Sequence, residues 1–128
     1  MDQISNLIIQ IKNAGNAGHQ SLDTAYSKLK HSILETLKKE GFVKDVEVKT
    51  EKGRKVLAIA LLMENRSPRI KGVQRISKPS KRVYKKASEM RAVKSGYGAL
   101  IVSTSKGVMS GSQAKKAALG GEALFTIW

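Results

Sequence analysis

Positive charge gathers in the second half of this 128-residue chain and limits how that half can fold. Residues 1–65 hold ten basic and eight acidic residues, a net charge of +2, whereas residues 66–128 hold fourteen basic and two acidic residues, a net charge of +12. Cations that repel one another must stay on the surface of a compact structure, and they favour a polyanionic partner. The charge pattern therefore predicts a nucleic-acid-binding surface in residues 66–128.

The densest basic stretch is residues 66–94, where eleven cations stand against one acid, Glu89. Disordered basic tails usually lack apolar residues, but here Ile70, Val73 and Val83 recur among the cations. This spacing favours folded strands with a basic surface over a disordered tail.

The composition excludes several kinds of site. The chain has no cysteine, which rules out disulfides and thiolate metal sites, and its two histidines are too few for a histidine-rich site. We therefore expect no metal and no cofactor. No apolar run approaches the roughly 20 residues of a membrane helix, and the first residues lack a secretory pattern, so we expect no membrane association and a cytoplasmic location.

Apolar periodicity predicts two helices in residues 1–65. The first carries an apolar stripe from Ile4 to Ile11, with Asp2 as its cap and Gly15 just past its end. The second is capped by Ser27 and closed by Gly41.

Three strands complete the predicted α-β-α-β-β order of this half. Residues 18–25 are interpreted as a loop that leads into a short strand, and a β-hairpin follows after the second helix, with strands over residues 42–50 and 54–63. Val46 and Val48 are expected on one side of the first hairpin strand. The second hairpin strand is almost continuously apolar, so we expect it to be central and covered by the helices.

Residues 64–68 contain a proline and no periodicity, which makes them the candidate boundary. We predict an α+β fold with two small subdomains, an N-terminal α/β subdomain over residues 1–65 and a mostly β, basic subdomain with short helices over residues 66–128. In the second, short strands around residues 70–76 and 82–84 flank a turn at 78–81. A buried strand is expected at 99–102 and a last strand at 122–128.

Two short helices are expected in the same subdomain. The first is capped by Ser88 and ended by Gly96 and Gly98, and the second begins at Ser110, which has capping-box spacing to Gln113.

A polar loop after the buried strand is the main candidate site. Ser103, Thr104 and Ser105 supply hydroxyls, Lys106 a cation and Gly107 flexibility, which suits hydrogen bonding to phosphate, ribose or base edges. A plain polar turn is the alternative. A hydrolase using Ser103 and Lys106 is a third interpretation, but the further motifs of serine acyl-enzymes are missing.

Other candidate residues are also cationic or aromatic. Tyr84, between Arg82 and Lys85, could stack on a base or sugar, or could be a half-buried strand residue. Lys28 and Lys30 begin the second helix and could hold a phosphate, or could form a solvated helix face.

Glu122 is the sole acid among the last 39 residues and follows Gly120 and Gly121. A carboxylate in so positive a region either pairs with a lysine or accepts from a nucleic-acid donor. Composition alone slightly favours the lysine pair.

Several motifs follow one another in a specific order along nearly the whole chain. They are Ser103–Met109, then after nine residues Leu119–Glu122, together with Ile11–Ala14, Ser27–Lys30, Lys39–Phe42, Gln74–Pro79 and Arg82–Lys85. This order resembles bacterial small-subunit ribosomal protein eight, the S-eight family.

The resemblance implies a two-domain, non-enzymatic protein that binds the central domain of small-subunit ribosomal RNA and supports its assembly, mainly through the C-terminal subdomain. It implies that Ser103, Thr104, Ser105 and Lys106 form the main RNA loop and that Glu122 and the adjoining glycines are the partner of this loop. It also implies Tyr84 as a packing surface and Lys28 and Lys30 as a lesser contact.

The resemblance further implies neighbouring small-subunit proteins as partners, with protein five among them. Family members in many bacteria also bind their own messenger RNA as feedback. The expected location is the small subunit of a cytoplasmic ribosome, with an organellar ribosome as the alternative.

The chain departs from the family pattern at two places. Ser110-Gly111-Ser112-Gln113 replaces an Asp-Arg-rich stretch, and Ser80 replaces a glycine. An architectural DNA-binding protein is the competing class, but a polar loop facing a lone carboxylate is better suited to RNA donors.

Overall fold

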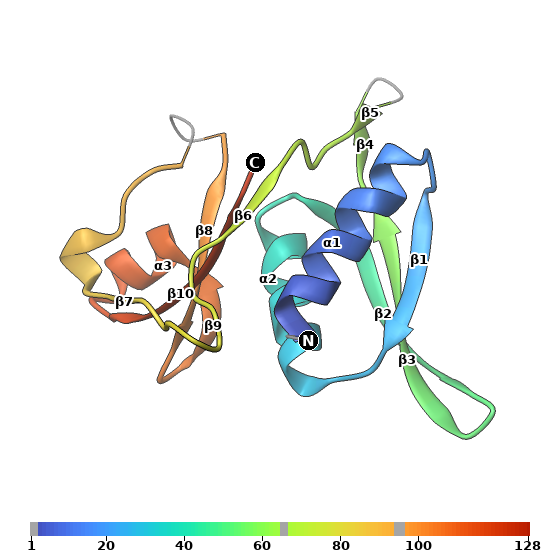
Figure 1. Ribbon diagram of the computed structural model, residues 1–128, viewed down its shortest axis with the longest axis horizontal. Helices are drawn as coiled ribbons and strands as arrows, with labels where there is room; N and C mark the ends of the chain where they lie inside the picture. Colours follow the sequence, from blue (N-terminus) through green and yellow to red (C-terminus); the bar gives the residue numbers. More distant parts are fainter. Residues whose placement is uncertain (1–2, 65–66, 94–96) are drawn as a thin grey trace. The chain divides into compact units, whose positions relative to one another are not determined.

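The computed structural model describes residues 3–64, 67–93 and 97–128, and the chain divides into two compact units, residues 3–71 and 72–128 (Figure 1). By sequence, the first unit holds thirteen basic and seven acidic residues, a net +6, and the second holds eleven basic and two acidic residues, a net +9. Packing therefore divides the chain after Lys71. A division of functions between residues 1–65 and 66–128 stays a prediction.

The first unit begins with helix α1, Gln3–Asn16, whose apolar stripe is buried as predicted. The predicted cap, Asp2, lies outside the described residues. Gly15 is inside α1 and not past its end. A Cβ at Gly15 would lie 3.0 Å from the Cβ of Pro68, so this glycine allows the later segment to pack on the helix.

Helix α2, Lys28–Lys39, has the predicted caps. The Ser27 hydroxyl accepts a hydrogen bond from the Lys30 N–H at 3.4 Å. Gly41 follows the helix with φ of +82°, a conformation that favours glycine. The helix buries Ile33, Leu34 and Leu37.

The sheet of this unit consists of β1 (Ser21–Ala25), β3 (Arg54–Leu61) and β2 (Val43–Glu51), in that spatial order and antiparallel. The second hairpin strand, β3, is central, as predicted. Its buried residues alternate, Leu57, Ile59 and Leu61, which places one face against the core. α1 contacts β1, and α2 contacts β2.

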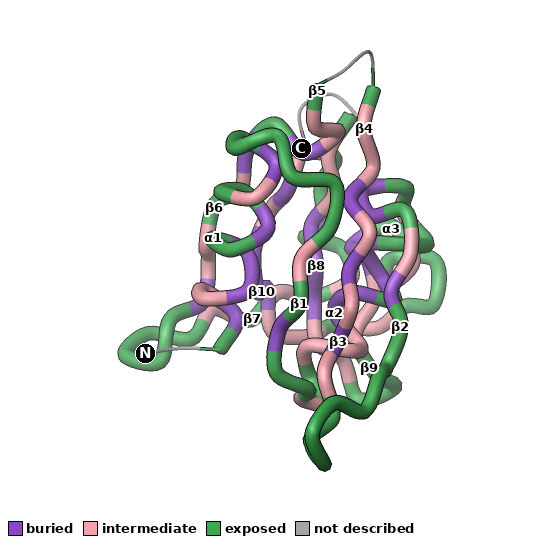
Figure 2. The backbone as a smooth tube through the Cα atoms, turned by 90° about the vertical axis from the view of Figure 1, so that its right-hand side faces the viewer, coloured by how far each residue is buried: buried purple, intermediate pink, exposed green. Residues whose placement is uncertain are grey.

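Two details of this unit add to the sequence-based expectation. Val46 and Val48 lie two residues apart in β2 and so on one side of it, but Val48 is 44% exposed, because β2 is exposed from Glu47 to Glu51 and its hairpin with β3 extends away from the core (Figure 2). The candidate boundary is not wholly irregular, since β4 (Met63–Glu64) pairs with β5 (Ser67–Pro68).

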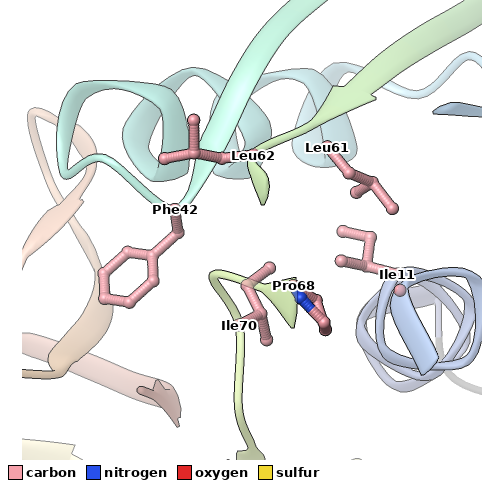
Figure 3. A pocket seen from close by; sticks show the side chains of 7 residues that line it. Ile11, Phe42, Leu61, Leu62, Pro68 and Ile70 are labelled. Carbon is pink, nitrogen blue, oxygen red and sulfur yellow. The ribbon is translucent and has the colours of Figure 1, made fainter. Parts of the chain in front are cut away.

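A small apolar pocket lies beside this pair of strands (Figure 3). The Arg69 guanidinium lies 4.3 Å from the centroid of the Phe42 ring at the pocket. The lining is apolar, so we interpret the pocket as a packing feature; it comprises Ile11, Gly15, Phe42, Leu61, Leu62, Pro68 and Ile70.

The second unit is built on a sheet with β10 (Gly121–Ile127) at its centre. One edge of β10 pairs with β8 (Ala99–Thr104), which pairs in turn with β9 (Gly107–Ser110). The other edge is shared by β6 (Val73–Arg75) and β7 (Tyr84–Lys85). Helix α3 (Gly111–Lys116) contacts β8, and the core cluster here comprises Met90, Leu100, Val102, Ala114 and Ala123.

The predicted helix capped by Ser88 is wrong. The segment forms a 3₁₀ turn, Ala87–Glu89, in which Ser88 is internal. The Lys86 N–H donates to the Glu89 carboxylate at 2.8 Å, so the acid stabilises the start of the turn. Gly98 forms a bridge with Val93 instead of ending a helix, and Gly96 lies outside the described residues.

The helix predicted at Ser110 is confirmed as α3, because the Ser110 hydroxyl accepts from the Gln113 N–H at 3.3 Å. Across the described ranges, no helix is both long and apolar enough to cross a membrane.

Candidate nucleic-acid interface

Three predicted site residues form a row across neighbouring strands of the second unit. Glu122 of β10 stands opposite Tyr84 of β7 on one side and opposite Ser103 of β8 on the other. Directly opposed residues of antiparallel strands project from the same face of a sheet. We call Tyr84, Glu122 and Ser103 the three-strand row.

The members of the row differ in exposure. Tyr84 is 68% exposed, so the half-buried alternative for this residue is wrong and its ring is accessible to a partner. The side chain of Glu122 is only 14% exposed. The row therefore places an open aromatic ring beside a largely covered carboxylate.

Among the described residues, Glu122 pairs with an arginine and not with a lysine. Nη1 of Arg82 lies 3.2 Å from Oε1 and 3.4 Å from Oε2 of Glu122, and the Arg82 side chain is 59% exposed. A guanidinium has five N–H donors, so Arg82 keeps donors for a second acceptor while Glu122 orients it.

The predicted loop is the end of a β-hairpin. β8 continues to Thr104 and β9 starts at Gly107, which leaves Ser105 and Lys106 at the exposed turn. The Thr104 hydroxyl donates to the Gly107 carbonyl at 2.8 Å and accepts from the Lys106 N–H at 3.2 Å. Thr104 therefore stabilises the turn that presents Ser105 and Lys106.

Gly120 and Gly121 allow close packing of strands around the row. A Cβ at Gly121 would collide with the Ser103 carbonyl oxygen, and a Cβ at Gly120 would lie 2.8 Å from the Lys85 carbonyl oxygen. Lys85 itself is half-buried and pairs with Gly121. The structure thus explains both glycines by backbone approach.

Lys28 and Lys30 belong to the first compact unit and form no part of the row. Lys28 is the exposed first residue of α2. Nζ of Lys30 lies 3.4 Å from the Thr24 hydroxyl and 3.4 Å from the Ala25 carbonyl, so this ammonium contacts the end of β1. Of the two lysines predicted to hold a phosphate at the start of α2, only Lys28 is therefore exposed and outside these contacts.

Ser77 is a residue of the second unit that was not among the predicted site residues. This residue is fully buried, and its hydroxyl accepts from the Val83 N–H at 2.9 Å and donates to the Val83 carbonyl at 3.2 Å. Ser77 lies within the motif Gln74–Pro79, but nothing in the sequence distinguishes this serine from one in an ordinary polar loop.

Both departures from the family pattern have a structural outcome. Ser110 supplies the cap of α3, as described above. At the other departure, Lys78 and Lys81 exchange two backbone hydrogen bonds of 2.9 and 3.0 Å, so the turn containing Ser80 forms without a glycine.

Ser103 and Lys106 lie at the same hairpin, but their side chains share no hydrogen bond in the described ranges. In the same part of the chain, no cluster of histidine and acidic side chains could hold a metal ion.

Comparisons with known proteins agree with the resemblance predicted from the motifs. The family model described as ribosomal protein S8 matches residues 2–128. The chain is 41% identical over 128 residues to small ribosomal subunit protein uS8 of Mycoplasmopsis synoviae, covering 99% of this chain and 97% of that protein. It is 43% identical over 128 residues to uS8 of Halalkalibacterium halodurans, with the same 99% and 97% coverage. It is 39% identical over 129 residues to uS8 of Bdellovibrio bacteriovorus, covering 100% of both chains. The chain therefore belongs to the ribosomal protein S8 family, a family of structural ribosomal proteins and not of enzymes.

Proposed function

We propose that this chain is a structural component of the small subunit of the cytoplasmic ribosome, where it associates with ribosomal RNA and with other ribosomal proteins. The family match over residues 2–128 and the uS8 relatives, which are matched over 97% of their own length, support this role. Sedimentation of the chain with native small subunits tests it, and a chain found only outside the ribosomal fractions would contradict it.

We further propose that the three-strand row recognises the central domain of small-subunit ribosomal RNA. The observation that carries this proposal is the direct opposition of Tyr84, Glu122 and Ser103 on one face. An exposed ring can stack on an unpaired base, while a carboxylate and a hydroxyl can read amino groups and 2′-hydroxyls. Arg82 adds a cation beside the row.

The surrounding charge supports the same partner. The second unit carries a net +9 by sequence, and Lys78, Lys81 and Lys106 are exposed. Contacts of such cations with phosphates fix position and affinity, whereas contacts with base and ribose groups provide specificity. The row and the cations thus divide these two tasks.

Architectural DNA binding is less well supported. Such proteins insert apolar wedges between base steps, usually Phe, Leu, Ile, Met or Pro. Among the described residues of the second unit, the exposed large hydrophobic side chains are two tyrosines, Tyr84 and Tyr97. An exposed tyrosine beside hydrogen-bonding groups is better suited to an unpaired RNA base.

Replacement of Tyr84 by alanine tests the row. We expect Tyr84→Ala to weaken binding to a central-domain RNA fragment by about 1–3 kcal/mol, the range for one stacked base. Tyr97→Ala is the matched control, because Tyr97 is 78% exposed in the same unit and lies outside the row. Equal losses in both variants, or no loss in either, would argue against recognition through the row.

We also propose that feedback binding to the protein's own messenger RNA uses the row, because the same chemistry serves any RNA that presents a similar structure. Competition between the two RNAs for one chain tests this idea, and simultaneous binding would contradict it.

Contact with protein five is a separate proposal, supported by family membership. Cross-linking within assembled small subunits tests that contact.

A further inference from the structure

Ser77 and Val83 flank a loop rich in cations, residues 78–82, which we call the basic loop. The loop leaves and rejoins β10 at one residue. The Ser77 N–H donates to the Ala123 carbonyl at 3.2 Å, and the Val83 carbonyl accepts from the Ala123 N–H at 2.9 Å. The base of the loop is therefore a single point on the central strand.

The Ser77 hydroxyl closes this base. It bonds both the N–H and the carbonyl of Val83, and Ser77 has no exposed surface. The Nε of Arg75 also donates to the Ser77 carbonyl. Removal of the hydroxyl would leave the part-buried Val83 N–H without this acceptor, which is costly.

Beyond its base, the described contacts of the basic loop are the ion pair between Arg82 and Glu122 of β10 and bonds within the loop. Its first four residues form a tight turn through the two backbone bonds between Lys78 and Lys81. This turn can move as one body if the base opens, and like charges favour such movement. Ser77 lies where that movement would start.

We propose that Ser77 is a positioning residue for RNA recognition. By fixing Val83, it fixes the residues on either side, so that Arg82 meets Glu122 and Tyr84 joins the three-strand row. This inference rests on the proposed RNA-binding function. Ser77 contacts no RNA itself, because it is fully buried.

Ser77→Ala in the full chain tests the proposal, and Ser110→Ala is the matched control. Both serines are buried, at 0% and 2% exposure, and each hydroxyl accepts a hydrogen bond from a backbone N–H of the second unit. Ser110 caps α3 and does not bond the basic loop. We therefore expect Ser77→Ala and Ser110→Ala to lose comparable stability, whereas only Ser77→Ala should disturb the three-strand row.

The readout is the ratio of affinities for a central-domain RNA fragment and for a scrambled RNA of the same composition, measured where both variants are fully folded. We expect Ser77→Ala to lower this ratio by about 10-fold, the equivalent of one lost hydrogen bond, through weaker binding of the central-domain fragment. Affinity for scrambled RNA should stay unchanged, because every cation is retained. Ser110→Ala should keep the wild-type ratio.

A second measurement does not depend on folding of the alanine variant. Ser77→Cys nearly keeps the side-chain volume but weakens both hydrogen bonds, so we expect an intermediate ratio and an altered NMR resonance of the Arg82 Nε–H. An unchanged affinity ratio in the folded Ser77 variants would overturn the role of Ser77 without touching the proposed function. An equally large fall of the ratio in Ser110→Ala would do the same. A wild-type chain that does not distinguish the two RNAs would overturn the proposed function as well.

Discussion

At the scale of single residues, Glu122 is the group whose charge opposes its surroundings. It is one of two acids in a unit with eleven cations, and its side chain is largely covered. If it only tempered the positive field, its removal would strengthen binding to every RNA. If it orients Arg82 and accepts from an RNA donor, its removal weakens binding to the correct RNA alone.

We expect the second result for Glu122→Gln. Binding of the central-domain fragment should weaken by about 1–3 kcal/mol, while binding of scrambled RNA stays unchanged or becomes tighter. Glu89→Gln is the matched control, since it changes the charge of the same unit equally, and Glu89 is exposed and bonds the Lys86 N–H. If Glu122→Gln increased the affinity for both RNAs equally, this carboxylate would have no part in recognising a specific RNA group.

Gly121 gives a prediction about stability. A methyl group there would meet the Ser103 carbonyl oxygen, and backbone cannot move aside as a side chain can. We expect Gly121→Ala to lower the free energy of unfolding by about 1–3 kcal/mol, the usual range for overpacking. Urea unfolding measures the change.

Gly111→Ala is the control for this substitution. The nearest neighbours of a Cβ at Gly111 are side-chain atoms of Leu100, its Cβ at 3.2 Å and its Cδ2 at 3.3 Å, a tight contact but a wider one than at Gly121. Gly111 also lies in α3, where alanine is favoured, so we expect a clearly smaller loss than in Gly121→Ala. A loss in Gly111→Ala as large as that in Gly121→Ala would contradict the explanation by backbone approach.

At the scale of elements, an ion pair joins the end of α2 to the start of β2. Nζ of Lys38 lies 3.0 Å from Oδ1 of Asp45, and the Val46 N–H donates to the same oxygen at 2.9 Å. The hydrogen bond from Lys38 is the main cause that lowers the pKa of Asp45, followed by the bond from Val46. The same bond with Asp45 raises the pKa of Lys38.

These shifts predict how the pair contributes to stability across pH. The lowered pKa of Asp45 means that its contribution is complete above the ordinary aspartate value of about 3.9 and is lost as pH falls through the lower folded value. The raised pKa of Lys38 means that its contribution is complete below about 10.4 and is lost as pH rises further. Asp45→Asn should remove both contributions.

We therefore expect the free energy of unfolding of Asp45→Asn to depend less on pH below about pH 4 than that of the wild type. Glu47→Gln is the control, because Glu47 is an exposed carboxylate of β2 without an ion pair among the described residues. Urea unfolding across a pH series decides, and identical acid profiles for wild type and Asp45→Asn would refute the link.

Local patterns were sufficient to predict most elements of the fold. The stripe of α1, the cap of α2 at Ser27 and the central position of β3 follow from side-chain spacing and capping chemistry. The Ser110 cap of α3 was predicted for the same reason.

Features that depend on contacts between distant segments could not be predicted in this way. Gly15 was predicted to follow the end of α1, because nothing local in the sequence shows that Pro68 packs on it. The three-strand row depends on the register of β7, β10 and β8, which joins residues far apart in the sequence. The role of Ser77 could not be predicted for the same reason. Ser77 meets Val83 because the segments that contain these two residues both bond to Ala123 of β10.

At the scale of the whole molecule, charge is shared more evenly between the compact units than between the two halves of the sequence. The compact units, residues 3–71 and 72–128, carry net charges of +6 and +9, whereas residues 1–65 and 66–128 carry +2 and +12. Arg69 and Lys71 belong by packing to the first unit. The first unit can thus also add a general attraction to RNA, while the second carries the row.

Single charge removals should distinguish the two contributions. We expect Lys81→Gln, in the basic loop, to lower the slope of log affinity against log salt by about 1, because one phosphate contact is lost. Lys49→Gln, on the exposed part of β2, should leave the slope unchanged. Equal reductions in both variants would instead indicate a diffuse attraction by the entire surface.

The deciding measurement for RNA recognition is the affinity of the unmodified chain for a central-domain RNA fragment and for its scrambled counterpart over a range of salt concentrations. We predict that both affinities fall steeply with salt, because phosphate contacts release counterions. Their ratio should stay at about 100-fold or more, because contacts of the row with base and ribose groups release none. A ratio near one at every salt concentration would contradict specific recognition and leave only attraction by charge.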